Sequence, residues 1–209
     1  MNGHRLRMAL VWLACAVVGC TSTPVRYYTL VPPPDKSLPV SEPTLSIDVR
    51  VGHIPPQLNR SELMVRTGPT ELTLLENERW ASPLDDEIKE ALRLALHRRL
   101  DRTSGLRSAT TKLEFDIDVR HFEAELGQYA LLEASWSATL SAAGRRSADA
   151  RAASCPFRAD EEIRTGYAGI VEGYQREIAA LADAIVAVLA ATASGADASC
   201  QNRSKAPPG

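Results

Sequence analysis

The sequence has few of the residues that usually build catalytic or metal sites. Its 209 residues include four cysteines and four histidines, and the histidines stand far apart, at positions 4, 53, 97 and 121. It contains no phosphate-binding glycine loop, serine-hydrolase elbow, zinc-protease histidine pair or Cys-x-x-Cys motif. We therefore expect no enzyme, no catalytic residue, no metal site and no cofactor.

An excess of basic residues is also absent. The chain carries 24 Lys and Arg against 26 Asp and Glu, for a formal net charge of −2. Nucleic-acid-binding domains present a basic patch or stripe, which this sequence does not provide. We expect no nucleic-acid partner.

Long hydrophobic runs are missing too. The two most apolar segments, residues 8–18 and 178–193, are each shorter than the about 20 residues that a membrane-spanning helix needs. Asp183 interrupts the second segment, so we expect that segment to be a helix packed against the core.

The apolar segment 8–18 has the surroundings of a secretory signal peptide. Arg5 and Arg7 precede it without any acidic residue, and small residues follow it. A buried core helix is the alternative interpretation. The basic flank and the lack of amphipathic periodicity make that alternative the weaker one.

The residues that end this segment, VVGC at positions 17–20, resemble the bacterial lipobox. That resemblance implies a signal peptide over residues 1–19, cleavage between Gly19 and Cys20, and attachment of a diacylglyceryl group to the Cys20 thiol. Several acyl chains together hold a protein durably on a membrane. The resemblance also implies sorting to the outer membrane, because the residue after the cysteine is Thr21 and not an Asp.

The cysteines divide into those used by this signal and those left in the folded domain. Cys15 is a weaker lipidation candidate than Cys20, because apolar residues flank it on both sides. Cys155 and Cys200 remain, and export to an oxidising compartment permits disulfides. We expect a Cys155–Cys200 disulfide; two free thiols, one of them buried, are the alternative.

Alternating apolar and polar residues predict half-buried strands in residues 45–51, 113–121 and 130–140. Two more strand-like segments flank Gly68-Pro69, which predicts a hairpin. His121 continues the apolar face of its strand, so we expect a core or edge histidine there.

The opposite face of segment 113–121 carries an acidic ladder of Glu114, Asp116 and Asp118. A divalent-cation site is one interpretation. Pairing with basic residues of neighbouring strands is the other, and we favour it because cross-strand pairs of opposite charge are common in sheets.

Helical spacing of apolar residues predicts one helix from Ser82-Pro83 to about residue 104 and another over residues 167–192. Ser82 suits the N-cap, and the acidic run at positions 85–87 complements the positive end of the helix dipole. Trp80, just before the cap, is expected in the core. The order of strands, helix, strands and helix predicts an α+β two-layer sandwich, a mostly antiparallel sheet with two long helices packed on one face.

These features give four segments. They are a signal peptide over 1–19, a lipidated N-terminus with the first short strand and a Pro-rich loop over 20–43, the rest of the α+β domain over 44–193, and a flexible tail over 194–209.

The lipobox and three further segments resemble the ABC-type transport auxiliary lipoproteins typified by PqiC, also called the YmbA family. The three segments are RYYTL at 26–30, the long segment 76–100 and the segment 166–189. That resemblance implies a non-enzymatic subunit of an envelope lipid transport system that supports membrane integrity. Its partner would be an MCE-domain protein, docked by a ring of copies of this chain. Cys20 would anchor the chain to the inner leaflet of the outer membrane, facing the periplasm.

The alternative is a stand-alone lipoprotein that binds an amphiphile or assists outer-membrane assembly. A large apolar cavity between helices and sheet would favour that alternative. A solid core with an exposed apolar patch would favour docking to a partner.

Overall fold

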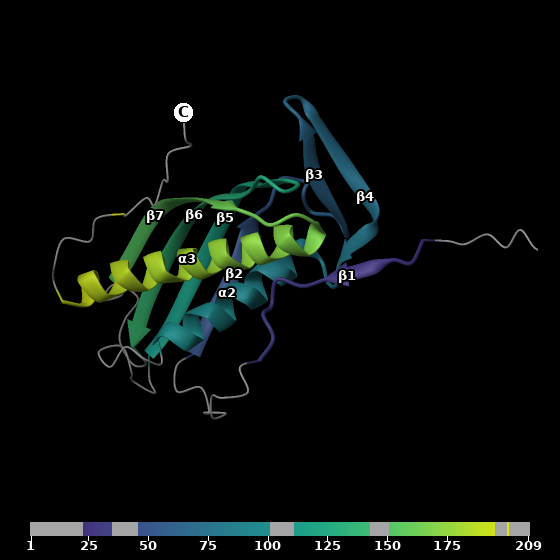
Figure 1. The fold of residues 1–209 in the computed structure, drawn as a ribbon. Coiled ribbons are helices and arrows are strands. Elements are labelled where there is room, and N and C mark those ends of the chain that lie inside the picture. The colour runs from purple at the N-terminus through teal and green to yellow at the C-terminus, as the bar shows by residue number, and fades with distance from the viewer. Residues whose placement is uncertain (1–22, 35–45, 101–110, 143–150, 195–199, 201–209) are drawn as a thin grey trace, which may run out of the picture.

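Seven strands form one sheet in the computed structural model, and two helices pack side by side over one face of it (Figure 1). The structure describes residues 23–34, 46–100, 111–142, 151–194 and 200. The predicted signal peptide, Gly19, Cys20 and most of the predicted tail lie outside the described residues. In chain order the elements are β1 (Arg26–Tyr28), β2 (Ser46–His53), β3 (Glu62–Gly68), β4 (Glu71–Trp80), α2 (Leu84–Leu100), β5 (Thr111–Glu125), β6 (Tyr129–Ala142), β7 (Arg151–Glu162) and α3 (Tyr167–Ala193).

The sheet is mixed and mostly antiparallel. Its order is β1-β4-β3-β5-β6-β7, and β2 pairs with β5 beside this path. The pairs β3–β4, β5–β6 and β6–β7 are antiparallel, whereas β1–β4 and β2–β5 are parallel. The predicted α+β architecture, with two helices on one face of a mostly antiparallel sheet, is confirmed.

The core lies between the helices and the covered face of the sheet. Both predicted helical stripes are buried there, as is the apolar side of β5 and β6. The buried stripe residues are Leu84, Ile88, Leu92 and Leu96 of α2, and Tyr174, Ile178, Leu181, Ile185 and Val188 of α3. No helix in the described part of the chain is both long and apolar enough to cross a membrane.

The second half of β5 corrects one prediction. The register between β5 and β6 shifts between Val119 and His121, as at a β-bulge, where an extra residue reverses which side chains face the core. Phe122 therefore takes the buried position, with 4% exposure, and His121 lies on the open face with 59% of its side chain exposed. The expectation that His121 continues the apolar face was wrong.

A glutamate of α3 is completely buried in this core. Glu177 has 0% exposure, and its Oε1 accepts a hydrogen bond of 3.1 Å from the backbone N–H of Leu132 in β6. Its other oxygen, Oε2, has no hydrogen-bond partner among the described residues. Burial raises the pKa of Glu177 well above its usual value of 4.5.

We expect Glu177→Gln to stabilise the protein at neutral pH. Folded Glu177 binds its proton more tightly than Glu177 of the unfolded chain, so the stability of the wild type falls as pH rises from about 4.5 through the raised folded-state pKa. Each unit of raised pKa corresponds to about 1.4 kcal/mol. Thermal unfolding of both proteins at several pH values should show a difference that grows with pH.

The matched control for this measurement is Glu76→Gln, which removes a carboxylate from an exposed position of β4. It should change the thermal midpoint little at any pH. A Glu177→Gln difference that shrinks with rising pH would show that the carboxylate is ionised in the folded protein.

Candidate functional site

The short strand β1 is fixed to the domain at its end nearest the core. Tyr28 pairs with Trp80 of β4, and the N–H of Ala81 donates a bond of 2.8 Å to the Tyr28 carbonyl. The Tyr28 hydroxyl donates to Glu78 Oε2 at 2.6 Å. Burial and this carboxylate raise the pKa of Tyr28. The segment that follows the predicted anchor is therefore part of the sheet.

Glu87, in the first turn of α2, fixes the next two residues of the same segment. Its side chain is buried, with 4% exposure for the residue, and accepts four hydrogen bonds. Oε2 accepts from Thr29 Oγ1 at 2.8 Å and from the Leu30 N–H at 2.7 Å. Oε1 accepts from Ser82 Oγ at 2.8 Å and the Ser82 N–H at 3.1 Å. Glu87 thus joins the helix start to the N-terminal segment.

The sequence interpretation of Glu87 was incomplete. We explained the acidic run at positions 85–87 by the helix dipole alone, but Glu87 is a buried acceptor with two backbone and two side-chain donors. Helical spacing would have placed Glu87 next to the buried positions Leu84 and Ile88. Its donors come from segments far apart in the sequence, which no spacing predicts.

The second helix contacts the same segment, because Gln175 Nε2 of α3 donates to the Thr29 carbonyl at 3.1 Å. We call this set of contacts the N-terminal network; it consists of Tyr28, Thr29, Leu30, Glu78, Ser82, Glu87 and Gln175. The three segments 26–30, 76–100 and 166–189, which carry the family resemblance, meet here. The N-terminal network therefore has a structural role: it holds a chain segment in place, and among its residues no nucleophile or acid–base pair faces the solvent.

An aromatic cluster lies beside the N-terminal network. Trp80 is buried, as predicted, with its ring centroid 6.1 Å from Phe122 and 6.3 Å from Tyr174. Phe122 and Tyr174 stack with centroids 3.7 Å apart. The cavity against this cluster measures about 20 Å³, roughly the room of one water molecule.

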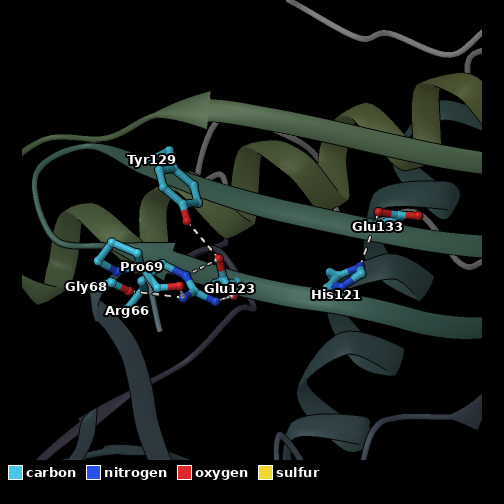
Figure 2. Close-up of polar contacts among 7 residues, drawn as sticks. All are labelled: Arg66, Gly68, Pro69, His121, Glu123, Tyr129 and Glu133. Atoms are coloured by element: carbon cyan, nitrogen blue, oxygen red, sulfur yellow. Dashed lines mark hydrogen bonds and ion pairs between the residues drawn. The ribbon is translucent and has the colours of Figure 1, made fainter. Parts of the chain in front are cut away.

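A second polar cluster joins the β3–β4 hairpin to the central sheet (Figure 2). Arg66 of β3 forms a two-pronged ion pair with Glu123 of β5, in which Nε lies 2.7 Å from Oε1. Arg66 Nη1 also donates to the carbonyls of Gly68 and Pro69 at 3.1 Å, and the hydroxyl of Tyr129 in β6 donates to Glu123 at 2.7 Å. We call these five residues the hairpin cluster.

The electrostatics of the hairpin cluster favour its charged form. Hydrogen bonding to Arg66 lowers the pKa of Glu123, and Glu123 in turn raises the pKa of Arg66. Burial, and then the bond to Glu123, raise the pKa of Tyr129 to about 12. The ion pair therefore persists across the physiological pH range and holds the hairpin in place.

Three exposed leucines lie in strands and a turn that meet at the hairpin cluster. Leu72 and Leu74 of β4 are 45% and 39% exposed, and Leu126 in the β5–β6 turn is 45% exposed. Leu72 lies directly across from Arg66 in the hairpin register, so both side chains share one face. We call Leu72, Leu74 and Leu126 the hairpin surface. Apolar side chains around a fixed ion pair are typical of protein-docking surfaces.

The open face of the sheet carries the acidic ladder, and basic residues pair with it. Arg50 Nε of β2 lies 2.9 Å from Asp116, and Lys112 Nζ lies 2.6 Å from Glu114. These contacts favour the ion-pair interpretation over the cation site. Nowhere in the described part of the chain do three His, Cys, Asp or Glu side chains gather where they could hold a metal ion.

His121 belongs to the same open face (Figure 2). His121 Nδ1 lies 3.2 Å from Glu133 Oε2, and Arg158 reaches the same oxygen at 3.0 Å. Glu133 thus has two basic neighbours on an exposed strand face. This arrangement is an ordinary cross-strand ion pair.

The two cysteines of the folded domain are bonded in the structure. A disulfide joins Cys155 of β7 to Cys200, with Cα atoms 5.5 Å apart. Cys155 is buried beside Trp136, its partner in the β6–β7 register. The bond attaches a residue from beyond α3 to the edge strand of the sheet.

Comparison with known proteins agrees with this picture. Residues 28–186 match the model of a family described as an ABC-type transport auxiliary lipoprotein component. No curated protein matches the chain. The crystal structure of an uncharacterized protein, 19% identical, aligns with a TM-score of 0.56 over 78% of this chain and 97% of its own.

A second crystal structure, of a Xanthomonas campestris protein of the DUF330 family, is 19% identical. It covers 77% of this chain and 92% of its own, with a TM-score of 0.48. The first of the two structures, at 19% identity, supports likeness of fold only.

Proposed function

The chain belongs to the family of ABC-type transport auxiliary lipoprotein components, and we propose that it is the non-enzymatic, membrane-anchored subunit of an MCE-type intermembrane lipid transporter. In this proposal Cys20 carries the lipid and holds the chain on the inner leaflet of the outer membrane. The folded domain faces the periplasm and docks an MCE-domain partner. Copies of the chain arranged as a ring would complete the contact.

The N-terminal network is the observation that carries this proposal. A short connection between lipid anchor and folded domain keeps the domain at the membrane surface. Hydrogen bonds from Thr29 and Leu30 to the buried Glu87 begin nine residues after Cys20, which leaves a short connection between anchor and domain. The network supplies that connection without any catalytic group.

The core favours docking over carriage of a lipid by the domain itself. The cavity of about 20 Å³ at the aromatic cluster is too small for an acyl chain, since ligand pockets usually measure about 300–1,000 Å³. The larger depression of about 530 Å³ beside β2 and α2 is lined by charged residues that include Asp48, Asp86 and Lys89. Among the described residues, large apolar side chains are exposed at the hairpin surface and, separately, at Val25 and Tyr27 beside β1.

We expect the double variant Leu72→Asp/Leu74→Asp to lose its partner. Two carboxylates in an apolar contact oppose its desolvation, so co-purification of an MCE-domain protein from the native envelope should fall by about tenfold or more. Ala187→Asp, which adds a carboxylate at an exposed position of α3, is the matched control and should retain the partner.

Two results would count against these proposals separately. Retention of the MCE-domain protein by the leucine variant would place docking on another surface. Wild-type protein that brings down no MCE-domain protein would contradict the transporter role and favour the stand-alone lipoprotein.

A further inference from the structure

We propose that the end of the domain around Tyr27, Arg60 and Arg79 rests on the phospholipid headgroups of the membrane that holds Cys20. This inference rests on the proposed lipid anchor, and it extends that proposal by assigning the surface that meets the membrane. The occupant we assign to this surface is an anionic phospholipid bilayer.

The length of chain between the anchor and the domain sets the first constraint. Arg26, the first residue of β1, comes six positions after Cys20 in the chain. A fully extended residue spans at most about 3.3–3.6 Å, so Arg26 lies within about 20 Å of the anchored residue. Acyl chains buried in the bilayer place Cys20 itself among the headgroups.

Because the domain is longer than the tether, the tether limits which end of the domain can face the membrane. The helix α3 has 27 residues, a length of about 40 Å at 1.5 Å per residue. It begins near β1 and runs away from it across the sheet (Figure 1). A domain turned to present the far end of α3 to the bilayer would hold β1 beyond the reach of the tether. The tether therefore excludes that orientation, and the proposal turns the β1 end toward the membrane.

The side chains at that end suit a headgroup layer. Tyr27 and Val25 of the β1 region are 66% and 43% exposed, and tyrosine is enriched where bilayer meets water. Tyr27 also borders a surface pocket of about 450 Å³ whose charged lining residues are Arg60 and Arg79. Arginine binds phosphate oxygens through its planar set of N–H donors. Arg79 lies 3.4 Å from the Glu62 carboxylate, and its Nε donates to the Glu76 carbonyl at 3.1 Å.

The charges elsewhere favour the same orientation. The open sheet face carries Glu114, Asp116 and Asp118, which an anionic bilayer repels. The hairpin surface begins at Leu72, seven residues along β4 from Arg79, or about 23 Å in an extended strand. Membrane contact and partner docking thus occupy separate ends of β4.

Fluorescence quenching by lipid tests this assignment in the full lipidated protein. The protein is reconstituted into vesicles of phosphatidylglycerol and brominated phosphatidylcholine, and a tryptophan is introduced as Tyr27→Trp. The matched control is Ala190→Trp, at an exposed position of α3 about 22 Å beyond Gln175. Trp80 and Trp136 are common to both variants and are subtracted with the wild type.

We expect strong quenching of the tryptophan at position 27 and little at position 190. Arg60→Ala, added to Tyr27→Trp, should lower the ratio of docked to undocked domains about fivefold, because an arginine near an anionic surface contributes about that factor. Arg50→Ala, which removes an exposed arginine of the open face, should leave the ratio unchanged.

The outcomes separate this inference from the anchor on which it depends. Acyl-labelled protein whose position 27 is not quenched, or is quenched no more than position 190, would overturn the membrane-facing surface alone. Wild-type protein without an acyl label on Cys20 would overturn the anchor and this inference together. Equal loss of quenching with Arg60→Ala and Arg50→Ala would show that the pocket does not hold headgroups.

Discussion

Replacing Glu87 with alanine is expected to lower the stability of the protein more than replacing Glu76 or Glu177. The change leaves the buried N–H of Leu30 and the N–H of Ser82 without their acceptor. Each unsatisfied buried donor costs about 1–3 kcal/mol, and the two hydroxyl bonds are lost as well. We expect a loss of about 3–5 kcal/mol, measured by denaturant unfolding, and a thermal midpoint lower by roughly 10 °C.

The conservative variant Glu87→Gln separates the charge from the packing. A glutamine amide offers one acceptor oxygen and one NH₂ group. Its NH₂ group must therefore face either the donors of Thr29 and Leu30 or the two donors of Ser82, and those hydrogen bonds are lost. Glu87→Gln should therefore be clearly destabilising while preserving side-chain volume. Asp86→Asn, at the neighbouring exposed position, is the matched control and should cost little.

A local readout shows whether Glu87 acts through the N-terminal segment. In Glu87→Gln the amide of Leu30 should exchange with solvent much faster than in the wild type, while amides in the centre of β6 keep their protection. Unchanged exchange at Leu30 would mean that the hydrogen bonds to Glu87 do not hold the segment.

The sequence was most informative where one face of an element is uniformly apolar. The stripes that begin at Leu84 in α2 and at Tyr174 in α3 identified both helices and their buried sides. The alternation in β6 identified its covered face, and Gly68-Pro69 identified the hairpin. In each case the pattern depends on neighbours in the same element, which is why local spacing suffices.

The features missed by the sequence depend on contacts between distant segments. The bulge near His121 reverses the faces of β5 halfway along the strand, and alternation on one strand does not report how its partner is aligned. The parallel pairing of β1 with β4 and of β2 with β5 leaves no trace in either pattern. Hydropathy also treats the buried carboxylates of Glu87 and Glu177 as surface residues.

The candidate site shows the same division. The segment at 17–20 that resembles a lipobox is a local pattern, so the sequence alone could predict it, and the segments of the family resemblance are local in the same way. The hairpin cluster could not, because Arg66 and Glu123 come from separate strands and either residue alone is an ordinary surface charge. Their meaning depends on the fold that brings them together.

The largest functional effect is expected from Cys20→Ala. Diacylglyceryl transfer requires the thiol, and the proposed cleavage leaves the lipidated Cys20 as the first residue of the chain. The variant should therefore lose acyl labelling completely and keep residues 1–19, which intact mass spectrometry detects directly. With no acyl chain and an uncleaved apolar segment 8–18, it should fail to reach the outer-membrane fraction.

Cys15→Ala is the matched control, because it removes a thiol from the same apolar segment five residues earlier. It should be labelled, cleaved before Cys20 and sorted like the wild type. Labelling that survives Cys20→Ala but disappears with Cys15→Ala would move the anchor to Cys15 and lengthen the tether by those five residues. The tether would then reach about 40 Å, comparable with the length of α3, and the domain would no longer be forced to turn its β1 end toward the membrane. The position of the lipidated cysteine thus decides both how the chain is held and which of its surfaces is left free for a partner.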